Sequence, residues 1–145
     1  MAPTTPTLEP VPIWNTPPSR ESLPEVYYPE SDGEPMAETD KHRKKLSYLV
    51  DALEVHFADH PTVYVSGNML LYYVEGNPYK FVAPDVFLVF GVRKKERRVY
   101  QVWKEGYQVP QVIIELTSQS TRKEDEIDKV NLYRDLGVQE YFQYD

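Results

Sequence analysis

APDVFLVF, residues 83–90, and VIIELTS, residues 112–118, are the two stretches that decide the fold of this chain. Each is an apolar run of strand length, rich in β-branched and aromatic residues. Each also carries one acid, Asp85 in the first stretch and Glu115 in the second. Ionised carboxylates are rarely buried unless they are paired or bind a metal ion. Two acids on neighbouring core strands therefore indicate a shared cation.

The residues after the second stretch predict a helix and a closing strand. Residues 121–136 have a helical apolar pattern, and Asp125, Lys129 and Tyr133 lie one turn apart on one side of that helix. Residues 138–145 predict the final strand. A strand–helix–strand order calls for a right-handed crossover and a parallel strand pair.

The part of the chain before residue 83 predicts one helix and further strands. Residues 38–59 have an apolar face at helical spacing. Residues 62–67 and 69–74 are strand-like, and Gly67-Asn68 between them is compatible with a hairpin, a bulge or a bend. Residues 99–103 add a short strand. The order of elements predicts an α/β fold with a mixed sheet flanked by helices. The apolar positions of the first helix are Leu46, Leu49, Val50, Leu53 and Phe57.

Two basic segments are candidates for contact with phosphate groups, and a solvated surface is the alternative for both. One lies in the first turns of the first helix, where positive charge opposes the helix dipole. The other is the loop of residues 91–98. His42 and Glu54 of the first helix could point toward the two acids or lie on the surface. The candidate contact residues are Arg93, Lys94, Lys95, Arg97, Arg98, Lys41 and Arg43.

The formal charge of −7 lies in the first forty residues. Residues 1–40 contain eight acids and one base, whereas residues 41–145 contain fifteen of each. A neutral domain with basic loops is compatible with a polyanionic partner.

The N-terminal segment is rich in proline, with nine of the 13 prolines before residue 37. Proline excludes long helices and central strands. We therefore divide the chain into a proline-rich acidic arm, residues 1–37, and one domain, residues 38–145. The arm is either a loosely packed tail or a segment that docks on the domain or on a partner through Trp14, Tyr27 or Tyr28.

Composition excludes several classes of protein. The chain has no cysteine, which excludes a disulfide framework, a thiolate zinc site and a cysteine nucleophile. No apolar run approaches the roughly 18 residues of a membrane span. The first residues lack the pattern of a secretory signal. We expect a cytoplasmic protein that does not enter a membrane.

The two acids and the helical lysine match the needs of phosphodiester hydrolysis. Asp85 and Glu115 supply the hard oxygen ligands that Mg²⁺ or Mn²⁺ prefers, and the backbone carbonyl of Leu116 is a candidate third ligand. Such an ion neutralises charge at a phosphate and activates a water. Lys129 is the candidate for orienting or deprotonating that water. In the alternative, both acids are structural and are satisfied by a helix N-terminus or an arginine.

The same residues carry a family resemblance. Pro84-Asp85 and, after 29 residues, Glu115-Leu116-Thr117 are similar to the PD-(D/E)XK nuclease signature, with Thr117 in place of the usual lysine. Residues 38–145 resemble the Uma-two family of restriction endonucleases, in which a serine-containing turn precedes a helix of the form D-x-x-x-K-x-x-x-Y. The matching residues here are Ser118, Ser120, Asp125, Lys129 and Tyr133.

The resemblance implies a restriction-endonuclease-like core, dependence on Mg²⁺ or Mn²⁺, and DNA as the substrate. It also implies that the lysine has moved from the strand to the helix, so that Lys129 replaces the one absent at Thr117. The remaining motif residues, Asp125, Ser118 and Tyr133, would support the site together with Thr117.

Two functions follow as hypotheses. The first is a Mg²⁺-dependent endonuclease that acts on DNA. Because cutting both strands of a duplex requires two active sites, we expect a homodimer. The second is a catalytically inactive nuclease-fold module that binds or regulates a partner. Whether a further hairpin follows Asp145 is left open.

Overall fold

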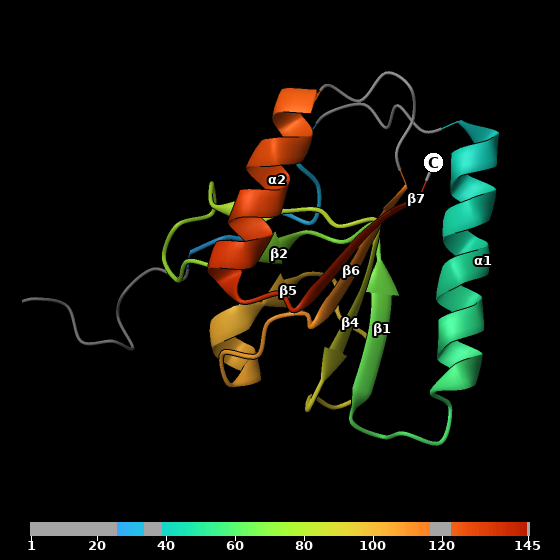
Figure 1. The fold of residues 1–145 in the computed structure, drawn as a ribbon. Coiled ribbons are helices and arrows are strands. Elements are labelled where there is room, and N and C mark those ends of the chain that lie inside the picture. Colours follow the sequence, from blue (N-terminus) through green and yellow to red (C-terminus); the bar gives the residue numbers. More distant parts are fainter. Residues whose placement is uncertain (1–25, 34–38, 117–122, 145) are drawn as a thin grey trace, which may run out of the picture.

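Two helices enclose the central sheet of the protein, one on each face (Figure 1). The structure, a computed structural model, describes residues 26–33, 39–116 and 123–144. Within these residues the chain forms a four-stranded sheet, in the order β1-β4-β6-β7, and a three-stranded sheet, in the order β3-β2-β5. The predicted α/β class with a mixed sheet is confirmed.

The four-stranded sheet has both acid-bearing stretches at its centre. β4 is antiparallel to β1 and to β6, whereas β7 is parallel to β6. α2 (Lys123–Leu136) connects β6 to β7, so the predicted strand–helix–strand order and parallel pair are confirmed. The strands are β1 (Val63–Gly67), β4 (Val86–Phe90), β6 (Val112–Leu116) and β7 (Glu140–Tyr144).

The smaller sheet shows what Gly67-Asn68 forms and where the strand predicted over residues 99–103 ends. Because β1 pairs with β4 while β2 pairs with β3 and β5, Gly67-Asn68 is a bend between the sheets and not a hairpin turn. Asn68 forms this bend with a φ of 51°, which asparagine tolerates better than most residues. The strand expected over residues 99–103 ends at Gln101, where the chain turns into a 3₁₀ helix. These elements are β2 (Leu71–Tyr72), β3 (Phe81–Val82), β5 (Tyr100–Gln101) and η2 (Val102–Glu105).

α1 (Asp40–His56) covers the face of the sheet opposite α2 (Figure 1). Its start is capped by Thr39, whose hydroxyl accepts a hydrogen bond from the backbone N–H of His42 at 3.1 Å. The five apolar residues of the predicted face are all half-buried, and no residue of α1 is fully buried. The helix is therefore attached to the sheet through one apolar stripe, and it is shorter than the expected 38–59.

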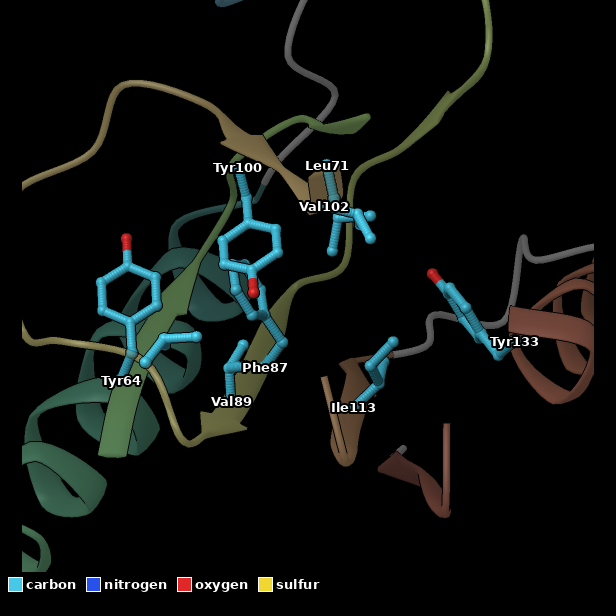
Figure 2. Close-up of a cluster of buried hydrophobic side chains, with 9 residues drawn as sticks. Tyr64, Leu71, Phe87, Val89, Tyr100, Val102, Ile113 and Tyr133 are labelled. Carbon is cyan, nitrogen blue, oxygen red and sulfur yellow. The ribbon is translucent and has the colours of Figure 1, made fainter. Parts of the chain in front are cut away.

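An aromatic cluster joins the two sheets (Figure 2). The rings of Tyr64, Phe87 and Tyr100 have centroids between 5.9 and 6.3 Å apart. The buried Tyr100 hydroxyl donates to the carbonyl of Gln108 at 2.6 Å, which satisfies its polar group. Tyr133 of α2 extends the cluster to the other helix. This packing fixes β4 and β6, the strands that position the two acids.

A short part of the N-terminal arm docks on the domain. Tyr28 packs against Tyr72 and Trp103, with ring centroids 5.0 and 5.2 Å away. Its hydroxyl accepts a hydrogen bond from the backbone N–H of Gly76 at 2.9 Å. Residues 26–33 are therefore a docked segment, as one of the two alternatives predicted, through Tyr28. Trp14 lies outside the described residues.

In the part of the chain that the structure describes, neither helix has the length and hydrophobicity needed to cross a membrane.

Candidate active site

Asp85 and Glu115 meet at one end of the four-stranded sheet. Asp85 directly precedes β4, whose first residue, Val86, lies opposite Ile114 of β6. Oδ2 of Asp85 accepts a hydrogen bond from the backbone N–H of Leu116 at 2.8 Å. Oε2 of Glu115 accepts one from the backbone N–H of Asp85 at 3.3 Å. The antiparallel register thus places the two carboxylates side by side and connects them through the backbone.

Glu115 is the buried acid of the pair, with 4% of its surface exposed. The hydroxyl of Tyr133 donates a hydrogen bond to Oε1 of Glu115 at 2.8 Å. Burial raises the pKa of Glu115 to about 7. The charge of Asp85 also raises this pKa, whereas the charge of Lys129 and the Tyr133 hydrogen bond lower it. Burial and the neighbouring carboxylate of Asp85 make it costly to ionise both acids at once, and a bound cation would offset that cost.

Lys129 lies on α2, one turn before Tyr133, and its positive charge acts on the carboxylate of Glu115. Its side chain is exposed, so the amine is accessible to a water or a ligand. Thr117 and Ser118 lie outside the described residues, and so does the side chain of Asp125. Their supporting roles stay predictions.

His42 is brought to the site by α1. Its Nε2 lies 3.5 Å from Oδ1 of Asp85, and about a fifth of each side chain is exposed. Glu54, the other residue left open by the sequence, lines a different cavity together with Tyr64 and Met69. A helical period shows that both residues lie near the apolar face, but it does not show which end of the helix reaches the acids.

The two basic segments lie at opposite ends of the four-stranded sheet. α1 begins beside Asp85, so Lys41 and Arg43 lie at the end that carries the acids. The loop 91–98 follows the other end of β4, and its Lys94 contacts the C-terminal end of α1. Five strand residues separate the two ends by roughly 13 Å. Lys41 and Arg43 are therefore the better placed candidates for the phosphate that reacts.

Arg97 is removed from the phosphate-contact candidates by its burial. Its guanidinium donates to both carboxylate oxygens of Glu105, at 2.9 and 3.0 Å, and lies 4.3 Å from the centroid of the Tyr64 ring. Only 4% of its side chain is exposed. The structure does not favour a phosphate contact for this residue, because its guanidinium is occupied by Glu105 inside the loop. The other four bases of the loop, Arg93, Lys94, Lys95 and Arg98, are exposed and stay candidates.

Gly67 lets Asp85 lie close to β1, and an alanine there is expected to displace it. A Cβ atom on Gly67 would lie 2.3 Å from the carbonyl oxygen of Asp85 and 3.2 Å from Cγ2 of Val50. Since the nearest atom belongs to the backbone, the segment before β4 has to move. We expect Gly67→Ala to cost about 1–3 kcal/mol of folding stability and to weaken metal binding.

Urea unfolding and a melting-temperature titration with Mn²⁺ measure these two effects of Gly67→Ala. The neighbouring Ser66→Ala is the control and should change neither. An unfolding midpoint and a Mn²⁺ response equal to those of the wild type would contradict the close contact with Asp85.

The donor atoms of the site fit a hard divalent cation. Two carboxylates converge, and the carbonyl of Leu116 belongs to the residue whose N–H binds Asp85. Among the described residues, no group of three or more His, Cys, Asp or Glu side chains is arranged to bind a metal. Mg²⁺ commonly uses one or two carboxylates and completes its coordination with water and substrate phosphate. The residues therefore fit a magnesium-type site that is open to a substrate.

Comparison with known proteins gives two matches. The family model described as "Uma2: Putative restriction endonuclease" matches residues 17–145. Among solved structures, the chain is similar to a "putative nuclease belonging to DUF820 from Anabaena variabilis ATCC 29413", with 14% sequence identity and a TM-score of 0.55. The similarity covers 84% of this chain and 69% of that one, and at this identity it shows the fold alone. No curated protein matches the chain.

Proposed function

Because the chain belongs to the Uma2 family, which is described as a restriction endonuclease family, we propose that it is a metal-dependent endonuclease that hydrolyses phosphodiester bonds of DNA. The observation that carries this proposal is the pairing of Asp85 with the buried Glu115. A buried carboxylate beside a second acid is costly unless a cation compensates the charge. The resemblance to the nuclease signature assigns metal binding to the same two residues.

Mg²⁺ or Mn²⁺ would be held by Asp85, Glu115 and the carbonyl of Leu116. Such an ion, when bound, neutralises phosphate charge and lowers the pKa of a coordinated water. The residues around the acids fix their orientation. The N–H of Leu116 and the hydroxyl of Tyr133 each hold one carboxylate oxygen at 2.8 Å, which leaves the other oxygens of the pair in a defined position.

Basic side chains flank the acids from both faces of the sheet. Lys129 on α2 would orient the attacking water, and its effect on the pKa of Glu115 supports its proximity. Lys41 and Arg43 at the start of α1 would contact the phosphates of the strand that is cut. Because these contacts bind the phosphate backbone, they position the substrate without selecting a sequence.

Cleavage of supercoiled plasmid in Mg²⁺, and separately in Mn²⁺, tests the proposal. We expect metal-dependent nicking that falls to the level of the EDTA control in Glu115→Ala and is strongly reduced in Lys129→Ala. Arg134→Ala is the matched control, since Arg134 is an exposed base of the same helix, and it should cut like the wild type. Loss in Glu115→Ala alone would keep the metal site and remove Lys129 from the mechanism. Absence of cleavage above the Glu115→Ala background, on plasmid and on single strands, would exclude the enzyme.

A nuclease-fold module without activity, which binds or regulates a partner, is the second candidate. It is favoured by Thr117, which stands where the nuclease signature has a lysine. A bound ion raises the melting temperature of the protein. Stabilisation by Mn²⁺ that is lost in Glu115→Ala would support the nuclease, and metal-independent melting would support the module.

We also propose that the protein acts in the cytoplasm and that it forms a homodimer. The reason for the homodimer is that cleavage of both strands of a duplex needs two active sites. Light scattering tests the oligomeric state. A monomer at working concentration would contradict the proposal that a stable dimer cleaves both strands.

A further inference from the structure

A groove between α1 and the edge of the four-stranded sheet lies outside the proposed catalytic residues. β7 is the last strand of this sheet in the described part of the chain, and its C-terminal end lies near α1, where Nζ of Lys45 lies over the ring of Tyr144 (Figure 1). The groove has a volume of about 440 Å³, and its lining includes Lys45, Tyr48, Leu49, Ile114, Phe142 and Tyr144.

Three aromatic side chains of the groove are largely exposed. The exposed fractions are 73% for Tyr48, 56% for Tyr144 and 51% for Phe142. Leu49 and Ile114, which are half-buried, complete an apolar lining. Adjacent exposed apolar side chains mark a binding surface, and flat aromatic rings are suited to stacking on nucleobases.

The groove is on the α1 face of the sheet and extends toward the end that carries the acid pair, whereas the side chain of Glu115 points to α2. Tyr144 lies opposite Leu116 in the parallel ladder of β6 and β7, and the N–H of Leu116 binds Asp85 at 2.8 Å. Because neighbouring strands lie about 4.8 Å apart, the backbone of Tyr144 is on the order of 10 Å from the carboxylate of Asp85. One strand of nucleic acid is long enough to contact both.

Lys45 lines the groove, and the first turns of α1 next to it carry further bases. Nζ of Lys45 lies 5.0 Å from the centroid of the Tyr144 ring. Lys41 and Lys44 precede it on α1 and are exposed. Basic residues that follow a phosphate backbone, together with rings that stack on bases, are the combination found in sites for single-stranded nucleic acid.

We propose that this groove binds an unpaired segment of DNA beside the phosphate that is cut. Bases of a duplex are stacked on one another, so their faces are not available to Tyr48, Phe142 and Tyr144. The preferred substrate is therefore DNA that has a single-stranded part, such as a free strand or a duplex with an overhang. This inference deepens the proposed endonuclease function and rests on it for its role, but the binding itself does not require cleavage.

Fluorescence anisotropy with a labelled short oligothymidylate, in EDTA and with the full chain, tests the proposal. We expect Tyr48→Ala and Tyr144→Ala each to weaken binding roughly ten-fold, as the loss of one stacked base does. A blunt duplex of the same length should bind more weakly and should not respond to either substitution. Tyr79→Ala is the matched control, because Tyr79 is 86% exposed on the loop between β2 and β3, and it should bind like the wild type.

A charge variant provides a second readout that an unfolded protein could not imitate. Lys45→Gln should reduce the slope of log affinity against log salt concentration by about 0.7, the value for one phosphate contact on a single strand. Melting curves of all variants should match the wild type, since the substituted side chains lie at the rim of an open groove.

Equal binding of oligothymidylate by the wild type and both tyrosine variants would overturn the proposal, and so would binding to the duplex alone. A dimer that Tyr144→Ala dissociates without a change in DNA binding would overturn it too, and would assign the groove to a second copy. The two proposals can fail separately. Tyrosine-dependent binding in a protein that does not nick plasmid would keep the groove and reject the nuclease. Nicking with tyrosine-independent binding would do the reverse.

Discussion

The metal-free protein is expected to lose about 3 kcal/mol of folding stability through Glu115 as the pH rises from about 4.5 to 8. The pKa of this carboxyl is raised from 4.5 to about 7, mainly by burial. Between these values the folded protein binds one proton more than the unfolded chain, so raising the pH favours unfolding. The stabilising contribution is complete below about pH 4.5 and is lost as the pH passes 7. Since Glu115 is only 4% exposed, solvent screening does not reduce this figure much.

Glu115→Gln isolates the effect, because glutamine cannot ionise. The side-chain oxygen of glutamine still accepts the hydrogen bond from Tyr133. Its NH₂ group takes the place of Oε2 and cannot accept the 3.3 Å hydrogen bond from the N–H of Asp85. Loss of that weak bond costs about 1 kcal/mol. We therefore expect the variant to be more stable than the wild type by about 2 kcal/mol at pH 8, with an advantage that disappears toward pH 5.

Urea unfolding in EDTA between pH 5 and 8 measures this prediction as the difference between the two proteins, which removes the contributions of other groups. Glu140→Gln, at an exposed acid of β7, is the control and should run parallel to the wild type. Parallel curves for Glu115→Gln and the wild type would show that Glu115 does not retain its proton in the folded state.

The main strands and the acid pair could be predicted from sequence because one physical fact governs both. β4 and β6 are apolar on both faces, so each had to be a central strand, and an acid in such a strand needs a partner. In the structure the two acids are held next to each other by hydrogen bonds. Asp85 accepts one from the backbone of Leu116, and Glu115 accepts one from the backbone of Asp85.

The features that sequence could not supply depend on contacts between distant segments. His42 and Glu54 lie near the same face of α1. Which of them reaches the acids depends only on the direction in which α1 crosses the sheet. Tyr28 reads as part of a proline-rich tail, yet it packs between Tyr72 and Trp103. A run of bases looks like a solvated loop, although one of them, Arg97, faces inward. No local pattern distinguishes an arginine that binds phosphate from one that binds a buried carboxylate.

Replacing Arg97 by alanine is expected to cost about 3–5 kcal/mol of folding stability, the range for breaking a buried ion pair. The carboxylate of Glu105, which is 13% exposed, would lose its two hydrogen bonds and remain mostly buried. Arg98→Ala is the matched control, since its side chain is 88% exposed and lies 3.5 Å from an exposed carboxylate of Glu30. Exposed pairs of this kind contribute about 0–1 kcal/mol. Urea unfolding of the two variants measures the difference.

A double variant separates the pair from the packing around it. In Arg97→Met with Glu105→Leu both charges are replaced by apolar side chains, so no buried charge is left without a partner, and much of the lost stability should return. DNA binding tests the alternative role of Arg97, a contact with phosphate. If Arg97→Ala is as stable as Arg98→Ala and binds DNA more weakly than the wild type, then its guanidinium faces the phosphates and not Glu105. If stability falls while DNA affinity per folded molecule is unchanged, Arg97 supports the loop from inside, and the phosphate contacts of this loop belong to its exposed bases.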